Sequence, residues 1–325
     1  MTVFLVLAIH EVGHLLGGWF AGFRALLLVV GPVKLERRRD GWAVGFNRVP
    51  ALWGGLAASA PTDTRDLQRR TLRMVVGGPL TSLAVGALGV LLWWLLPLRP
   101  PSADSPAEFA SLGLVLLAVG SLGIGVVTLV PATTSGFPTD GAQILRQLRG
   151  GPEAKAHAAL QALVGLSLGG ARPRDWPHAL VEQALELQPD TAMGLSSLQM
   201  AHVHALDHGR ISDARGFLEL ALASRETLPG ALRPGLLAQG AYFAAAHDGD
   251  PERARRLLEE VKGPGLGAEH LLLLAEVAVR LGEGDDAGAR ERVDPARARL
   301  HTAIDAGTAR AQAEWLDHVV EGGRG

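Results

Sequence analysis

His10, Glu11 and His14 form an H-E-x-x-H pattern close to the start of the chain. On a helix, histidines four residues apart lie on one face, one turn from each other. Two imidazoles in that arrangement can bind one zinc ion, and the glutamate between them can act as a base on a metal-bound water. The spacing therefore predicts a metal centre on a helix.

The setting of this pattern is apolar. Residues 2–23 carry no charge outside the pattern, and the apolar run continues to about Val30, which is enough for one membrane crossing. No basic segment precedes the run, so we expect a first transmembrane helix rather than a secretory signal peptide. Ionisable groups inside a membrane span are costly and usually functional, which favours metal binding over a structural polar cluster.

A catalytic zinc ion needs a third protein ligand, with the fourth position left for water. The chain has no cysteine, so this ligand must be His, Asp or Glu. Asp140 is the candidate, because it follows the third apolar span in a stretch broken by proline and precedes Gly141. Spacing leaves an alternative equally open, in which Thr139 or Asp140 only caps a helix expected over residues 141–148.

Several elements must position these side chains. Apolar runs at residues 71–96 and 109–130 predict a second and a third membrane span. Asp40-Gly41 between β-prone runs predicts a short hairpin of residues 33–37 and 42–46 at the membrane surface. Residues 54–73 are expected to form a loop that enters a helix, with candidate N-caps at Thr62, Asp63 and Thr64.

Basic residues orient the three spans. They are concentrated between the first and second spans (Lys34, Arg37, Arg38, Arg39, Arg48, Arg65, Arg69, Arg70) and after the third (Arg146, Arg149, Lys155). The 97–108 connection carries only Arg99. The positive-inside rule therefore predicts an external N-terminus and a cytoplasmic hairpin loop and C-terminal part. Arg37 to Arg39 are expected to contact lipid headgroups, and the net charge of −2 argues against a nucleic-acid partner.

Residues 151–325 are expected to form a soluble α-helical domain. Glycine and proline divide this part into helices of ordinary length. A weak repeat pairs Gly209 with Ala214, Gly249 with Ala254, and Gly282 with Ala287, at steps typical of helix pairs. The stretch 201–222 resembles a tetratricopeptide unit, which implies tetratricopeptide-like hairpins and a protein partner. His202, His204 and His208 lack a third ligand and, with Asp207, are expected on a solvated face.

The motifs of residues 1 to about 150 resemble those of the site-2 protease family of intramembrane zinc metalloproteases. They are His10 to His14 in a first span, Gly78-Pro79-Leu80 in a second, and Asp140-Gly141 after a third. The resemblance implies that His10, His14 and Asp140 bind zinc, that Glu11 is the catalytic base, and that the hairpin presents substrate. The family often has asparagine at the positions of Ser82 and Thr128, whose hydroxyls can also donate a hydrogen bond.

The expected architecture is thus mainly α, with a polytopic membrane core over residues 1–150 and a cytoplasmic repeat domain over 151–325. The expected function is that of a multi-pass cell-membrane zinc metalloendopeptidase. By resemblance, it hydrolyses peptide bonds in or near the transmembrane segment of single-pass membrane proteins. One alternative is an inactive membrane-anchored scaffold that acts through its repeat domain, and another is a soluble zincin.

Overall fold

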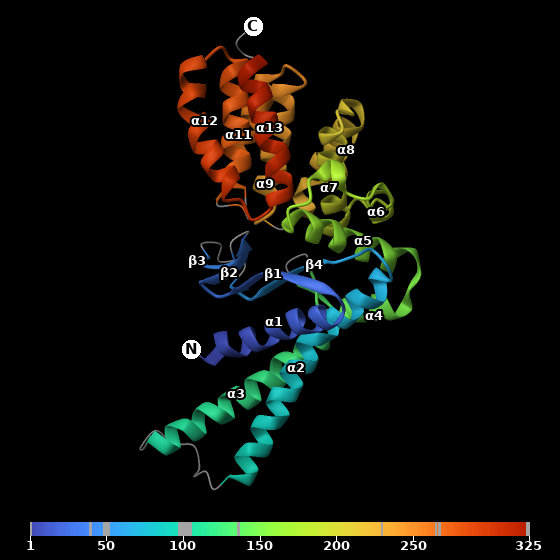
Figure 1. Cartoon of the computed structure of the whole chain (residues 1–325), viewed down its shortest axis with the longest axis vertical. Helices are drawn as coiled ribbons and strands as arrows, with labels where there is room; N and C mark the ends of the chain where they lie inside the picture. Colours follow the sequence, from blue (N-terminus) through green and yellow to red (C-terminus); the bar gives the residue numbers. More distant parts are fainter. Residues whose placement is uncertain are drawn as a thin grey trace. The chain divides into compact units, whose positions relative to one another are not determined.

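The computed structural model of the chain describes residues 2–38, 41–47, 53–96, 106–134, 137–228, 230–263, 265 and 268–322. The chain divides into two compact units, Met1–Ala154 and Lys155–Gly325, here called unit 1 and unit 2. Both units are mainly helical (Figure 1), and unit 1 also contains a small antiparallel sheet.

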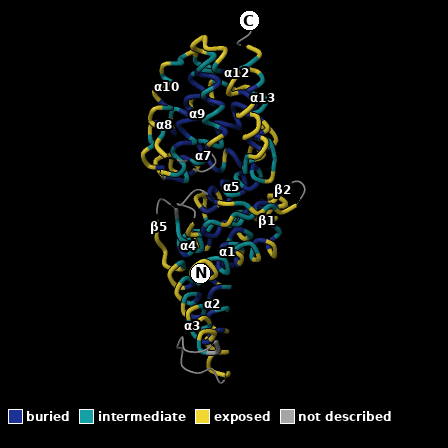
Figure 2. The backbone as a smooth tube through the Cα atoms, turned by 90° about the vertical axis from the view of Figure 1, so that its left-hand side faces the viewer, coloured by how far each residue is buried: buried dark blue, intermediate teal, exposed yellow. Residues whose placement is uncertain are grey.

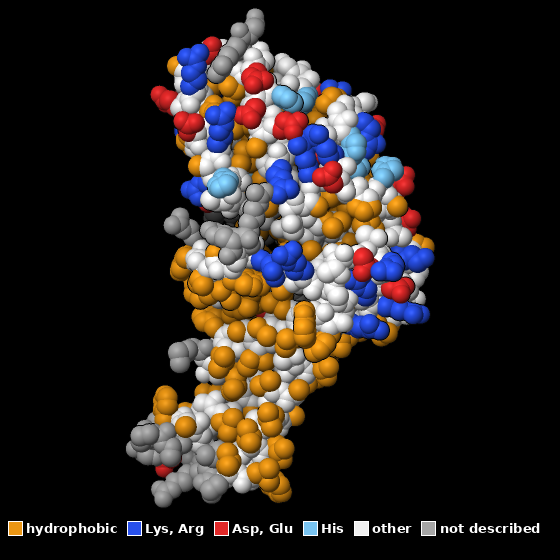
Figure 3. All heavy atoms as spheres, viewed as in Figure 1, with side chains coloured by type: hydrophobic (Ala, Val, Ile, Leu, Met, Phe, Trp, Pro, Cys, Tyr) orange, Lys and Arg blue, Asp and Glu red, His pale blue; other side chains and the backbone are white. Residues whose placement is uncertain are grey.

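Three long helices form the frame of unit 1: α1 (Thr2–Phe20), α2 (Leu67–Leu95) and α3 (Pro106–Leu129). Each is long and apolar enough to cross a membrane. α2 packs against both α1 and α3. Only 17% of the apolar stretch of α3 is buried within the protein. Apolar side chains, orange in Figure 3, cover the surface of these helices. The three predicted apolar helices are confirmed, and their outer surface is compatible with a membrane protein.

α1 and α2 approach each other at backbone distance. A Cβ atom at Gly13 would overlap the Gly77 carbonyl oxygen, and one at Gly17 would overlap that of Arg73. Small residues at both positions are what close packing of apolar helices requires. This contact determines which side of α2 faces His10 and His14.

The sheet of unit 1 has four antiparallel strands in the order β3-β2-β1-β4. Their bounds are β1 (Phe23–Val30), β2 (Val33–Arg38), β3 (Gly41–Phe46) and β4 (Leu56–Pro61). β2 and β3 pair as the predicted hairpin, with Leu35 opposite Val44. The predicted turn residue Asp40 lies outside the described residues, as does Arg39.

Two sequence predictions are wrong in this region. The first helix does not extend toward Val30, since it ends at Phe20 and the rest of the apolar run forms β1. Gly22, with φ +78°, ends the helix in a conformation that side chains disfavour. A short apolar run buried in a central strand has no period that distinguishes it from a buried helix. The region 54–73, expected to be a loop, contains β4.

Arg70 connects the end of α1 to the start of α2. Its side chain, only 11% exposed, donates hydrogen bonds to the carbonyl oxygens of Ala21 (2.7 Å) and Gly22 (2.6 Å). It also donates to the Asp63 carboxylate at 2.8 Å. The N-cap of α2 is Asp66, at φ +47° and without a side-chain cap bond, and not one of the three predicted residues. The Arg70 guanidinium, rather than a cap, secures this corner.

Replacing Arg70 with glutamine should lower the free energy of unfolding by about 2–4 kcal/mol, because several hydrogen bonds to a partly buried charge are lost together. Arg70→Lys keeps the charge but lacks the planar fork, so it should recover less than half of the loss. Denaturant titration of the full chain in mild detergent measures the effect. Arg69→Gln, an exposed neighbour, should change stability by less than about 0.5 kcal/mol. Equal losses in both variants would contradict this role.

A short segment after α3 leads into α4 (Asp140–Arg149). It contains the two-residue strands β5 (Thr133–Thr134) and β6 (Phe137–Pro138). The Thr139 hydroxyl caps α4 by accepting a hydrogen bond from the Ala142 N–H. A Cβ atom at Gly141 would overlap the Leu129 carbonyl oxygen at the end of α3. The glycine therefore allows α4 to start directly beside the third span.

Unit 2 consists of helices that pack in sequence-adjacent pairs. The pairs are α7 (Ala192–Asp207) with α8 (Ile211–Ala223), α9 (Arg233–Ala246) with α10 (Pro251–Glu259), and α11 (Glu269–Gly282) with α12 (Asp286–His301). α9 and α11 of successive pairs also pack against each other. The remaining helices are α5 (Gly151–Leu168, which begins in unit 1), α6 (His178–Ala184), α13 (Ala306–Gly322) and the short 3-10 turns η2 (Pro173–Asp175) and η3 (Arg225–Thr227). Figure 2 shows buried residues along α7 and α9.

The turns within these pairs contain glycine at positive φ. Gly209 and Gly249 are two of them, and the alanines five residues later, Ala214 and Ala254, are buried. The third is Gly284, followed by buried Ala289, and not the predicted Gly282 and Ala287. Gly282, the glycine of the sequence pattern, lies in the last turn of α11 and not in the turn between α11 and α12.

The histidines of α7 do not lie on a solvated face. His202 and His204 are buried, and their Nδ1 atoms donate to the carbonyl oxygens of Ala214 (2.9 Å) and Pro173 (2.8 Å). The fully buried Asp207 carboxylate accepts hydrogen bonds from Arg172. The prediction of a solvated face is wrong for His202, His204 and Asp207, because α7 is covered on several sides, whereas His208, just after the helix, is exposed. His208 donates to the His204 carbonyl oxygen.

Unit 2 should lose stability as the pH falls below 6.5. Burial lowers the pKa of His202 to about 4, whereas an unfolded histidine has a pKa of about 6.5. Above pH 6.5 the side chain is neutral in both states. Between pH 6.5 and 4 only the unfolded state gains a proton, so the unfolding free energy should fall by about 1.4 kcal/mol per pH unit.

Hydrogen exchange of the α7 amides in the full chain, corrected for intrinsic rates, measures this dependence. From pH 7 to pH 5 the opening free energy should drop by about 2 kcal/mol through His202. Other buried histidines contribute as well, so the informative quantity is the difference from His202→Gln, which should have a flatter pH profile. An identical profile in this variant would rule out His202 as the source.

Candidate metal centre

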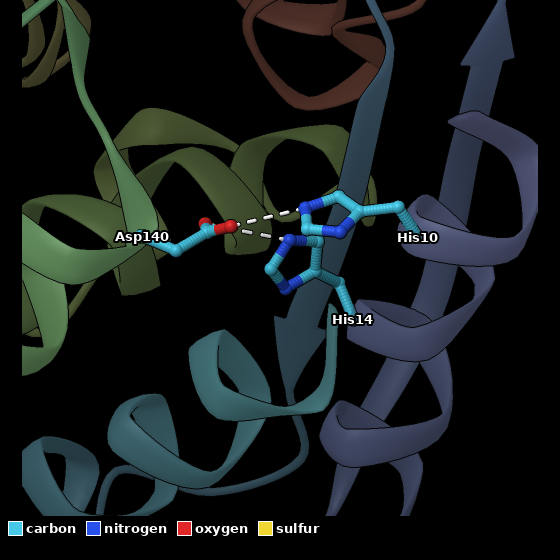
Figure 4. A group of neighbouring side chains, drawn as sticks. All are labelled: His10, His14 and Asp140. Atoms are coloured by element: carbon cyan, nitrogen blue, oxygen red, sulfur yellow. Dashed lines mark hydrogen bonds and ion pairs between the residues drawn. The ribbon is translucent and has the colours of Figure 1, made fainter. Parts of the chain in front are cut away.

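His10, His14 and Asp140 converge although they are far apart in the sequence (Figure 4). The histidines project from α1, and the aspartate from the first turn of α4. Asp140 Oδ2 lies 3.0 Å from His10 Nε2, and Asp140 Oδ1 lies 3.4 Å from His14 Nε2. One potential ligand atom from each residue lies within 4.8 Å of the other two. Among the described residues, this is the one cluster of His, Asp and Glu side chains whose potential ligand atoms lie close enough together to hold a metal ion.

The other nitrogen of each imidazole contacts α2. His10 Nδ1 lies 3.0 Å from the Ser82 hydroxyl oxygen, and His14 Nδ1 lies 3.1 Å from the Met74 carbonyl oxygen. A carbonyl oxygen only accepts hydrogen bonds, so His14 Nδ1 must carry the proton. The Nε2 atom of neutral His14 then directs a lone pair toward the Asp140 carboxylate. Two lone-pair donors facing each other require a cation between them, either a second proton or a metal ion.

Asp140 is available for this role because its neighbour caps the helix. The Thr139 hydroxyl accepts the Ala142 N–H, whereas the Asp140 carboxylate points at the histidines. Of the two roles that the spacing left open, Thr139 fills the cap and Asp140 joins the histidines.

The three side chains fit a zinc ion in their chemistry. Two imidazole nitrogens and one carboxylate oxygen are a ligand set of the kind that catalytic zinc uses, with a fourth position open. Each histidine is oriented by a hydrogen bond at its other nitrogen, which is the usual support of a metal-ligating imidazole. The ligand set also accommodates other divalent metals that bind nitrogen and oxygen.

Glu11 lies next to this group but is not part of it. Its side chain is buried, and its carboxylate accepts a hydrogen bond from the backbone N–H of Ala57 in β4. A Cβ atom at Gly55 would overlap the carboxylate. β4 and the residue before it thus form one wall of the Glu11 position.

Comparison of the chain with models of protein families, with curated proteins and with solved structures found no match. What can be said of the site follows from its own residues and geometry.

Three contributors to the site were not identified from the sequence. Gly78 lies against His14, because a Cβ atom there would overlap the imidazole ring. Gly55 has the same relation to Glu11, and the Met74 carbonyl oxygen orients His14. The sequence analysis noted Gly78-Pro79 as a motif, but the sequence did not indicate that Gly78 makes room for the His14 ring. Ser82 contacts His10, while the buried hydroxyl of Thr128 has no hydrogen-bond partner among the described residues.

Proposed function

We propose that the chain is a zinc metalloprotease that hydrolyses peptide bonds in or near the transmembrane segments of membrane proteins. The observation that carries this proposal is the convergence of His10, His14 and Asp140 beside a buried Glu11, on helices apolar enough to span a membrane. A buried acid next to an oriented metal-ligand set has a chemical use in hydrolysis but no evident use in helix packing.

His10, His14 and Asp140 would hold the ion. Bound zinc would supply Lewis-acid chemistry, polarising the scissile carbonyl and making water more acidic. The Glu11 carboxylate takes the proton from the attacking water and delivers it to the leaving amine. The Ala57 N–H and Gly55 hold that carboxylate in place, while Ser82 and Met74 keep the imidazoles oriented.

Gly55→Ala should reduce hydrolysis by about 10–100-fold, because the added methyl group displaces the Glu11 carboxylate and small displacements of reacting groups are costly. The φ of +109° at this position is also one that alanine rarely adopts, so the backbone of the variant would be strained. Gly54→Ala is the matched control, since a Cβ atom there meets nothing within 4 Å. Initial rates of substrate cleavage distinguish the two variants. Equal rates would contradict the assigned role of β4.

The sheet geometry changes which strand is expected to receive substrate. The sequence pointed to the 33–46 hairpin, but β3 is the sheet edge farthest from β4 in the strand order. β4 forms the other edge and packs against α1, and its Ala57 reaches Glu11. We therefore propose that an unwound substrate segment adds as a strand to β4, the sheet edge beside Glu11.

The remaining assignments are proposals as well. They comprise an external N-terminus, a cytoplasmic unit 2, and a protein partner bound by the helix pairs of unit 2. The concentration of basic residues between the first and second spans and directly after the third supports this orientation. In this proposal, α1 to α3 are surrounded by the lipid bilayer, and the substrates are single-pass proteins of the same membrane.

The direct test reconstitutes the purified full chain with single-pass membrane proteins and follows their cleavage. Cleavage within the transmembrane region that is lost on chelation and restored by added zinc supports the proposal. Cleavage that is insensitive to chelation would overturn it. Absence of cleavage, with zinc bound and several substrates tested, would favour the membrane-anchored scaffold. Extraction of the chain by salt alone, without detergent, would instead indicate a soluble protein.

A further inference from the structure

Four arginines surround an open cavity of about 510 Å³ where the end of α1 meets the start of α2. Arg69 and Arg73 are four residues apart in α2, which places them along one side of the helix, and Arg65 lies in the turn just before it. Arg70 lines the same cavity, as do Phe20 and the aspartates Asp63 and Asp66. We call this group of residues the arginine cradle.

The cradle has a surplus of positive charge. Its four arginines outnumber its two aspartates, so its formal charge is +2. Asp63 pairs with Arg70 at 2.8 Å and lies 3.6 Å from Arg65. Arg69 and Arg73 are exposed, and no acidic residue pairs with either in the described part of the chain. Two guanidinium groups one helical turn apart can clamp a phosphate through paired N–H donors.

The cradle lies at the boundary between polar and apolar surface. Arg73 is the last charged residue of α2, and the rest of that helix is apolar to Leu95. Trp19 and Phe20, at the end of α1, are 66% and 77% exposed. Exposed aromatic residues at the end of an apolar helix are typical of the membrane–water interface. In Figure 3, basic side chains gather near the start of α2, beyond the apolar surface of the spans.

We propose that the arginine cradle binds the phosphate of an anionic phospholipid. Charge complementarity selects an anion, and the exposed Phe20 beside the guanidinium groups offers apolar contact to the acyl chains of a lipid, which a free anion would not use. The unpaired Arg69 and Arg73 carry the headgroup interaction, while Arg70 stays committed to Ala21 and Gly22. A lipid in this position would hold α1 and α2 together at the corner that Arg70 secures. The proposal does not depend on the proteolytic activity.

The test titrates the full chain, purified in non-ionic detergent, with phosphatidylglycerol and with zwitterionic phosphatidylcholine, and counts bound lipids by native mass spectrometry. Phosphatidylglycerol should bind at least about tenfold more tightly. The double variant Arg69→Gln/Arg73→Gln should weaken phosphatidylglycerol binding by about 10–30-fold, since two cationic contacts are lost. Both arginines are exposed, so the variant should unfold at the wild-type temperature.

The matched control is Arg256→Gln/Arg290→Gln, which removes two exposed arginines of α10 and α12 in unit 2. It should bind phosphatidylglycerol as the wild type does. Equal binding of the two lipids, or wild-type affinity in the Arg69/Arg73 variant, would overturn the proposal. Displacement of the lipid by millimolar inorganic phosphate would also overturn it in favour of a free anion, and displacement by a soluble acidic peptide in favour of a protein partner.

Discussion

Glu11→Gln should lower the rate of substrate hydrolysis by about 10²–10⁴-fold while the zinc content of the chain stays at the wild-type level. Glutamine has the size of glutamate and can keep the hydrogen bond from Ala57, but its amide cannot accept a proton from water. Glu11 lies outside the group of three potential ligands, so the metal should remain. Single-turnover cleavage and metal analysis of the same preparation measure both quantities.

Glu11→Asp serves as the companion variant. It keeps a carboxylate but withdraws it by one methylene group from the Ala57 N–H, so its activity should lie between those of the wild type and Glu11→Gln. If Glu11→Gln cleaves substrate as the wild type does while zinc is bound, the protease proposal fails. Loss of zinc in this variant would instead show that Glu11 is a metal ligand.

Asp140→Asn should reduce zinc affinity by more than about 100-fold and abolish hydrolysis with it. Removing a residue that only orients a ligand costs about 10–100-fold in affinity, and loss of a ligand should exceed that range. The isosteric amide keeps the size of the side chain but lacks the negative charge that faces both Nε2 atoms. Competition with a chelator of known affinity measures the change in the full chain.

Two further variants calibrate this result. Asp66→Asn removes the same charge from unit 1 at a left-handed position that asparagine tolerates, and it should bind zinc normally. Ser82→Ala removes the contact to His10 Nδ1 and should weaken zinc binding by about 10–100-fold. Unchanged zinc retention and activity in Asp140→Asn would remove Asp140 from the site.

The sequence predicted the three apolar helices because length and composition alone identify such elements. It also predicted the pairing of β2 with β3 from the Asp40-Gly41 dipeptide between β-prone runs. β1 escaped prediction because, apart from Arg24, it is a short apolar run without a periodicity that distinguishes a strand from a helix. The N-cap of α2 was misplaced because Arg70, from within the helix, does the work that a capping side chain would do.

Within the site, His10, Glu11 and His14 were recognisable because helical spacing places them together. Asp140 was named, but spacing could not distinguish a ligand from a cap, which only the positions of Thr139 and Ala142 decide. The contribution of Met74 is a backbone carbonyl oxygen, which any residue supplies, so no sequence signal exists for it. Gly55 contributes because it has no side chain, which leaves room for the Glu11 carboxylate, and the sequence alone does not show that the two residues meet.

The separation of 130 residues between His10 and Asp140 has a consequence for biosynthesis. A nascent chain that has emerged only as far as α3 contains both histidines and Glu11 but lacks the carboxylate that completes the group. Such an intermediate has two nitrogen donors and should hold metal weakly. If the proposed activity is correct, the chain cannot cleave its neighbours in the insertion machinery until α4 has been synthesised and packed. The order of synthesis then serves as a safeguard against premature proteolysis.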